Sequence, residues 1–163
     1  MMTQVYLGLG ANIKPQASLQ AGVAELREQF GAIDLSPVYL APAIGMNGPD
    51  FLNMVVGFTC PMSHSELMIW IRRVEAKHGR VRSAAANHQP TSHGLDMDVL
   101  LFGELVDSAL KVPRPDIITC AYVLQPLADL APNLVHPCSG QSMVQLHSSC
   151  PLAQHLTSVQ LSF

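Results

Sequence analysis

The sequence has few positively charged residues, no closely spaced pair of cysteines and no long apolar run. Its 9 lysines and arginines are outnumbered by 12 acidic residues, giving a formal net charge of −3, whereas dedicated nucleic-acid binders are usually basic. No apolar run reaches the roughly 18 residues that a membrane span requires. A charged content of 13% beside 48% hydrophobic residues argues against a disordered chain. We therefore expect a globular protein that binds neither nucleic acid nor membranes.

The cysteines and the first residues bear on location. The four cysteines form no CxxC pair, and no histidine stands at zinc-finger spacing from them. The opening MMTQVYLGLGAN lacks the charged region and cleavage site of a signal peptide. We predict free thiols, a cytoplasmic location and a monomer. The 163 residues suit one domain, residues 1–163.

Hydrophobic patterning predicts an alternation of strands and helices. Strands are predicted over 4–10, 32–42, 51–59 and 95–102. Pro37 indicates an edge or a bulge in the second strand. Apolar residues spaced by three and four predict a helix over 17–30. With a second helix after residue 63, the order βαββαβ predicts an α+β domain, a two-layer sandwich with an antiparallel sheet.

The second helix carries the clearest start signal in the chain. Ser63 and Glu66 form a capping box, and Gly79 is the expected stop. The stretch 81–93 shows no periodicity and is predicted to be a loop, a length at which loops are often functional.

The C-terminal third is predicted to be mostly helical or irregular. A turn at residues 103–104 could form a hairpin with the segment 105–108. A helix is predicted over 117–130, with Pro126 breaking or kinking it. A short helix near 141–147 and a tail follow.

Two aspartates stand in the apolar stretch GLDMDVLLFG. Side chains alternate along a strand, so Asp96 and Asp98 share a face with Leu100 and Phe102, about 6–7 Å apart at the backbone. Their oxygens could converge on one or two divalent cations, and Mg²⁺ is usually bound by one or two carboxylates plus substrate phosphates. The alternative is that both aspartates face water on an open sheet.

Basic residues gather after the capping box and would attract an anion. They are Arg72, Arg73, Lys77, Arg80 and Arg82, and Glu75 lies among them. The first three could simply complement the helix dipole. Arg80 and Arg82 lie past the expected helix stop, which favours phosphate contacts for these two.

Asn53 interrupts an otherwise apolar strand. Its amide could read the edge of a flat heterocycle, with Phe51 on the same face as a wall. The alternative is a core asparagine bonded to backbone. The run GLGAN at 8–12 is not a phosphate loop, because it lacks the required pattern, so its glycines indicate close packing or a strand end.

These segments together resemble the hydroxymethyldihydropterin pyrophosphokinases of the folate pathway, as a divergent member. The matching runs, in order, are VYLGLGAN, SPVYLAPAIG, DFLNMVV, VEAKHGRVR, LDMDVLLFG, VPRPD and VLQPLADLAPNLVHP. The resemblance implies a ferredoxin-like α+β fold. It also implies Mg²⁺-dependent transfer of pyrophosphate from ATP to 6-hydroxymethyl-7,8-dihydropterin, with release of AMP.

The resemblance also implies roles for particular residues. Asp96 and Asp98 would hold two Mg²⁺ ions and, with Arg80 and Arg82, would be catalytic. The pterin pocket would be lined by Pro42, Ile44, Phe51, Asn53 and Tyr122, the last stacking on the ring. The nucleotide would contact Glu75, Arg80, Arg82, His93 and Arg114.

Several positions depart from the family pattern. The stretch AANHQPTSHGLD lacks the usual arginine and aromatic residues, and His93 stands where an arginine is expected. Arg114 replaces a histidine, and Cys120 stands at a later arginine position. Two alternative functions follow: a catalytically weakened paralogue that binds a pterin or nucleotide as a regulatory module, and a Mg²⁺-dependent enzyme acting on another heterocyclic substrate.

Overall fold

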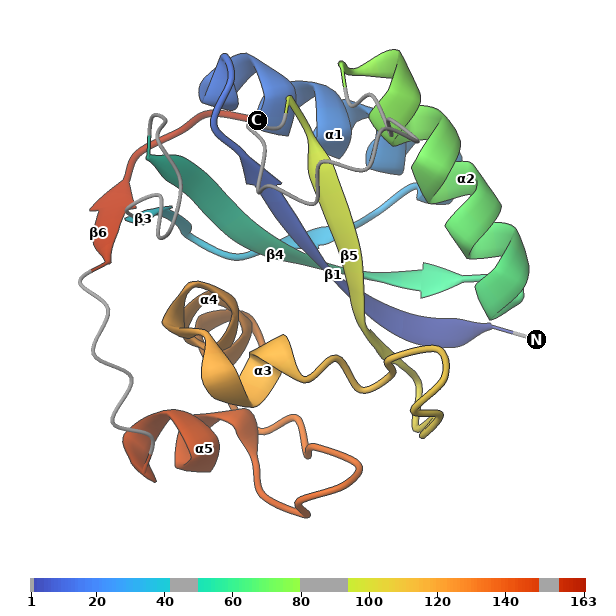
Figure 1. Ribbon diagram of the computed structural model, residues 1–163, viewed down its shortest axis with the longest axis vertical. Coiled ribbons are helices and arrows are strands. Elements are labelled where there is room, and N and C mark those ends of the chain that lie inside the picture. The colour runs from blue at the N-terminus through green and yellow to red at the C-terminus, as the bar shows by residue number, and fades with distance from the viewer. Residues whose placement is uncertain (1, 42–49, 80–93, 150–155) are drawn as a thin grey trace, which may run out of the picture.

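One antiparallel sheet runs through the middle of the molecule (Figure 1). The structure is a computed structural model that describes residues 2–41, 50–79, 94–149 and 156–163. The strands are β1 (Thr3–Ala11), β2 (Asp34–Leu35), β3 (Val38–Ala41), β4 (Phe51–Cys60), β5 (Asp96–Phe102) and β6 (Thr157–Val159). Their order across the sheet is β5-β1-β4-β3-β6, and β2 also pairs with β4.

Two helices cover one face of this sheet. They are α1 (Pro15–Phe30) and α2 (His64–Lys77), and with the strands up to β5 they give the order βαβββαβ, which is βαββαβ when the short β2 is counted together with β3. This order and the antiparallel pairing confirm the predicted α+β ferredoxin-like fold. The core beneath them is apolar, with Leu7, Leu9, Leu26, Leu67 and Ile71 all buried.

Three shorter helices lie on the other side of the sheet (Figure 1): α3 (Asp116–Thr119), α4 (Ala121–Leu130) and α5 (Met143–Ser149). Of these, α4 contacts the sheet, and α5 packs against α4. A second hydrophobic cluster forms there, and Leu124 and Leu127 of α4 pack with Val55 and Leu101 of the sheet. The two-layer core therefore carries an additional helical cover on this face. No helix in the described ranges is long and apolar enough to cross a membrane.

Local signals account for the starts of both long helices. Pro15 occupies the first turn of α1, where its missing N–H costs no hydrogen bond, so the helix starts two residues before the predicted range. The capping box of α2 is confirmed: Ser63 Oγ accepts from the Glu66 N–H at 3.2 Å, and Glu66 Oε2 accepts from the Ser63 N–H at 2.8 Å. Gly79 follows the end of α2 with φ +91°.

The strand predicted over 32–42 is divided into β2 and β3. Between them, the Ser36 N–H donates to the Val55 carbonyl at 2.9 Å, and Ser36 Oγ accepts from the Val55 N–H at 2.8 Å. A side-chain hydroxyl thus takes the place of a strand carbonyl, next to a proline that cannot donate. Pro37 marks this interruption and not the sheet edge, because β6, predicted only as a tail, pairs outside β3.

The helix predicted over 117–130 is two helices. Cys120 separates α3 from α4 with an extended backbone (φ −128°, ψ 117°), while Pro126 lies inside α4. A break at Pro126 is therefore wrong, while a kink at Pro126 stays a prediction. The segment 105–108 forms no strand either; only an isolated bridge joins Asp107 to Val112. The short helix predicted near 141–147 is α5.

Candidate functional site

The register of β5 brings its two aspartates to the α4 side of the sheet. Asp96 pairs with Gly10 and Asp98 with Gly8 on β1. The pairing then shifts by one residue, which leaves Leu100 as the extra residue of a β-bulge. Leu100 stays on the aspartate face, as predicted. Phe102 does not: the bulge turns it to the opposite face, where its ring lies 5.6 Å from that of His64.

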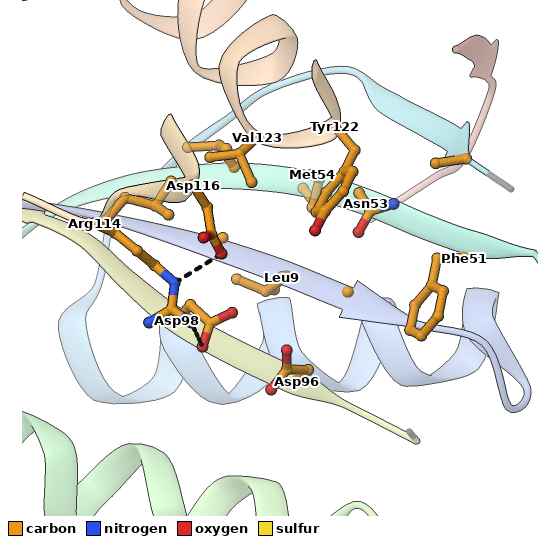
Figure 2. Close-up of a pocket in the computed structure, with 15 residues that line it drawn as sticks. Leu9, Phe51, Asn53, Met54, Asp96, Asp98, Arg114, Asp116, Tyr122 and Val123 are labelled. Atoms are coloured by element: carbon orange, nitrogen blue, oxygen red, sulfur yellow. Dashed lines mark hydrogen bonds and ion pairs between the residues drawn. The ribbon is translucent and has the colours of Figure 1, made fainter. Parts of the chain in front are cut away.

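The aspartates open onto a cavity of about 300 Å³ (Figure 2). Its lining includes Asp96, Asp98, Phe51, Asn53, Tyr122, Arg114 and Asp116. The predicted metal pair, pterin amide and both aromatic residues thus share one pocket with one predicted nucleotide contact. The sheet is not open around the two aspartates, because α3 and α4 contribute residues to the same cavity.

Gly8 and Gly10 lie in the floor of this cavity. A Cβ placed on Gly10 would lie 2.9 Å from Asn53 Oδ1, closer than such contacts occur. Glycine at this position therefore permits the Asn53 side chain to lie flat against β1. The prediction of close packing for the glycines of the GLGAN run is confirmed at Gly10, and both glycines belong to strand β1.

Asn53 presents a polar group inside this apolar strand. The residue is 8% exposed, and its Nδ2 is buried with no hydrogen-bond acceptor among the described residues. A buried N–H group without an acceptor is costly. An oxygen or ring nitrogen of a bound heterocycle would accept this bond, which favours the ligand-binding interpretation of Asn53 over a core asparagine whose amide N–H is satisfied by backbone.

Two aromatic side chains approach the cavity from different elements. Figure 2 shows Tyr122 extending from α4 toward the sheet beside Asn53, and Phe51 on β4 farther along the pocket. Burial raises the pKa of the Tyr122 phenol well above its usual range, and the Cys120 thiol and nearby carboxylates of Asp116 and Asp98 raise it further. The Tyr122 ring is therefore a neutral surface at physiological pH.

Arg114 lies between two carboxylates. Its Nη2 is 3.5 Å from Asp98 Oδ1 and its Nε is 3.2 Å from Asp116 Oδ2. The Arg114 backbone N–H donates to the Leu100 carbonyl at 2.9 Å, which ties this segment to the bulge. Asp116 was not predicted as a site residue; its position two residues after Arg114 was the signal that could have found it, but an aspartate starting a helix is also a normal helix feature.

Glu75 supports the same strand from the other side. It is 1% exposed on α2, and its Oε2 accepts from the Met97 N–H at 3.0 Å. Met97 stands between the two aspartates, so this contact fixes the backbone that carries them. Glu75 is absent from the described lining of the cavity, and its nucleotide contact stays a prediction.

Other predicted residues lie elsewhere or outside the described ranges. Pro42, Ile44, Arg80, Arg82 and His93 are outside them. Arg72, Arg73 and Lys77 are exposed on α2, and Lys77 Nζ lies 2.5 Å from Glu25 Oε1. Lys77 lies in the last turn of α2, where its charge complements the helix dipole, whereas Arg72 and Arg73 precede that turn.

The donor set of the pocket fits Mg²⁺. Asp96 and Asp98 supply hard carboxylate oxygens, the ligands this ion prefers. In the described part of the chain, no group of three or more His, Cys, Asp or Glu residues could hold a metal. Two carboxylates leave most of an octahedral shell to water and phosphate oxygens, as is usual where Mg²⁺ is bound together with a nucleotide.

The cavity thus combines a carboxylate pair with an amide and two aromatic rings. Residues 6–132 match the family model of 7,8-dihydro-6-hydroxymethylpterin-pyrophosphokinase (HPPK). The chain belongs to this family, as its sequence motifs predict.

Curated relatives match nearly the whole chain. The chain is similar to 2-amino-4-hydroxy-6-hydroxymethyldihydropteridine pyrophosphokinase of Pseudomonas aeruginosa, with 34% identity over 157 residues, covering 93% of this chain and 94% of the relative. The Aquifex aeolicus protein of that name is 33% identical, covering 83% and 85%. Plasmodium falciparum HPPK-DHPS matches with a TM-score of 0.70 and 11% identity over 91% of this chain, which supports the fold alone; the chain spans 45% of that one.

Proposed function

We propose that this chain transfers pyrophosphate from ATP to 6-hydroxymethyl-7,8-dihydropterin, in folate biosynthesis. The hydroxymethyl oxygen attacks the β-phosphorus of ATP, the bond from that phosphorus to the α-phosphate oxygen breaks, and AMP leaves while the hydroxyl proton is lost. The observation that carries this proposal is the shared cavity: the carboxylate pair, Asn53 and both aromatic residues line one space. Residues 1–163 would act as one domain, as a monomer in the cytoplasm.

The amide end of the cavity is proposed to hold the pterin. Asn53 Nδ2 would donate to the ring, which removes its unsatisfied state. Tyr122 and Phe51 would supply apolar ring surface, because flat aromatic groups stack favourably. Pro42 and Ile44, predicted from the family resemblance, would complete this end.

The acidic end is proposed to hold the metal–nucleotide. Asp96 and Asp98 would hold Mg²⁺, which supplies neutralisation of phosphate charge during transfer. Arg114 would bind phosphate oxygens through charge-assisted hydrogen bonds, together with the predicted contacts Arg80, Arg82, His93 and Glu75. The protein then contributes chiefly by positioning the hydroxyl against the phosphorus.

The test is AMP release from ATP, Mg²⁺ and 6-hydroxymethyl-7,8-dihydropterin. Asp98→Ala is expected to lower the rate by at least roughly 100-fold, the scale of losing a group that stabilises phosphoryl charge. Asp34→Ala removes an exposed carboxylate at another strand and is the matched control, with a rate expected to stay within about twofold.

The same assay separates the alternative functions. A folded wild-type protein that binds the pterin but forms no AMP would refute the transferase proposal and support a catalytically weakened paralogue. Metal-dependent product from another heterocycle, with none from the pterin, would support a different substrate. Equal loss of activity in Asp98→Ala and in the control Asp34→Ala would refute a specific role for Asp98.

A further inference from the structure

Arg114 is the only cation among the described residues that line the cavity. Its side chain is 28% exposed, and it contacts the Asp98 carboxylate that is proposed to bind metal. A guanidinium and a divalent cation repel each other, so both cannot take the same side of one carboxylate without a large electrostatic cost. The structure thus places a competitor for the metal inside the proposed metal site.

The two contacts of Arg114 use different nitrogens. Nη2 faces Asp98 while Nε faces Asp116. The guanidinium carries five N–H donors in a fixed fork. It can therefore leave Asp98, keep its Nε contact with Asp116, and direct its remaining N–H groups to phosphate oxygens. The backbone bond from the Arg114 N–H to Leu100 does not involve the side chain, and it can persist during this movement.

We propose that Arg114 is a positioning residue that occupies Asp98 in the ligand-free protein and is displaced onto the phosphates when the metal–nucleotide binds. Asp116 holds the guanidinium within the pocket during the exchange. Arg114 thereby weakens binding of metal alone and strengthens binding of metal together with nucleotide. This inference rests on the proposed function, because it requires a metal at Asp98.

The opposite explanation is a fixed support, in which Arg114 only holds Asp98 and Asp116 in place. The two explanations predict opposite changes in the affinity for metal alone when Arg114 is removed. Removal of a fixed support loosens both carboxylates, so metal alone and metal–nucleotide would each bind more weakly. Removal of a displaced competitor makes metal alone bind more tightly while metal–nucleotide binds more weakly.

The experiment measures Mn²⁺ binding by the electron paramagnetic resonance of free Mn²⁺, first without nucleotide. Arg114→Gln is expected to bind Mn²⁺ roughly tenfold more tightly than wild type, a size typical of coupled sites. The second titration uses Mg²⁺ with an ATP analogue whose α and β phosphorus atoms are joined by a methylene group, so that no AMP can form. The same variant is expected to bind this complex roughly tenfold more weakly.

Arg72→Gln is the matched control, since it removes the same charge from an exposed position on α2, across the sheet from the cavity. It is expected to leave both affinities within about twofold. Arg114→Lys keeps the charge but loses the fork, and it should retain the weak Mn²⁺ binding of wild type while binding the nucleotide complex less well. An equal change in Arg72→Gln would reduce the effect to net charge and overturn the proposal.

Asp98→Asn separates this inference from the proposed function. If wild type binds Mn²⁺ and Asp98→Asn does not, the metal site stands; an Arg114→Gln affinity that is then unchanged or weaker overturns the displacement alone. If wild type binds no Mn²⁺ with or without the analogue, the metal site and the displacement both fail.

Discussion

The two faces of the sheet are built from the same strands yet differ in what they enclose. On β1, Val5, Leu7 and Leu9 point to the face covered by α1 and α2, and all are buried in a continuous apolar core. The alternate positions on the other face include Gly8 and Gly10, which have no side chain to fill the space. One face therefore provides stability, and the other provides a cavity because side chains are missing from its floor.

The largest effect is expected from truncating a side chain on the face that α1 and α2 cover. Leu7→Ala removes a side chain with 0% exposure from the core between the sheet and the long helices. Such truncations lower the free energy of unfolding by about 2–5 kcal/mol, because a cavity replaces packed atoms. Urea denaturation followed by circular dichroism measures it. A loss below about 1 kcal/mol would contradict the tight packing of this face.

A smaller effect, on ligand affinity and not on stability, is expected from adding a side chain to the floor of the cavity. In Gly10→Ala the added Cβ meets Asn53 Oδ1 at 2.9 Å, so the amide must shift. We expect affinity for the reduced pterin, measured by calorimetry, to fall roughly tenfold, the scale of one displaced hydrogen bond.

Gly8→Ala is the matched control, because its Cβ would meet Leu100 only at ordinary contact distances of 3.5 Å and beyond. Pterin affinity in Gly8→Ala should therefore fall less than in Gly10→Ala. Equal affinities in the two variants would show that Asn53 does not orient the ring.

The smallest effect is expected at the start of α2, where hydrogen bonding from Ser63 lowers the pKa of Glu66 below its ordinary value of 4.5. A carboxyl group whose pKa is lower in the folded than in the unfolded state stabilises the fold above the unfolded pKa. That contribution is lost as pH falls through the folded pKa. In Glu66→Gln, the decline of Tm from pH 6 to pH 3 should be less steep than in wild type. Parallel declines would show that the capping box does not contribute.

Local patterns predicted most of this fold and the centre of the site. The capping box and the helix spacings predicted the two long helices. Strand alternation placed Asp96, Asp98, Asn53 and Phe51 on strands, facing the side where the cavity lies. Each of these signals lies within a few neighbouring residues. The roles implied for Tyr122 and Arg114 came from the family resemblance, and both residues line the cavity. Their contact with ligands stays a prediction.

The features that the sequence did not predict depend on contacts with residues far away in the sequence. The bulge that turns Phe102 away from the aspartates is a mismatch between β5 and β1, and no feature of β5 alone reveals it. The strand β6 forms because β3 offers it an edge. Such features follow from register and tertiary contact, which composition and periodicity do not encode.

The contact between Glu75 and Met97 has a consequence for association between molecules. Among the described strands, β5 lies at the end of the sheet, and an end strand presents outward N–H groups on which a strand of another chain could add. The buried Glu75 carboxylate accepts a hydrogen bond from the Met97 N–H, and α2, which carries Glu75, lies along this edge. The chain's own helix thus blocks the addition of another strand at the Met97 N–H, between the two aspartates that line the cavity.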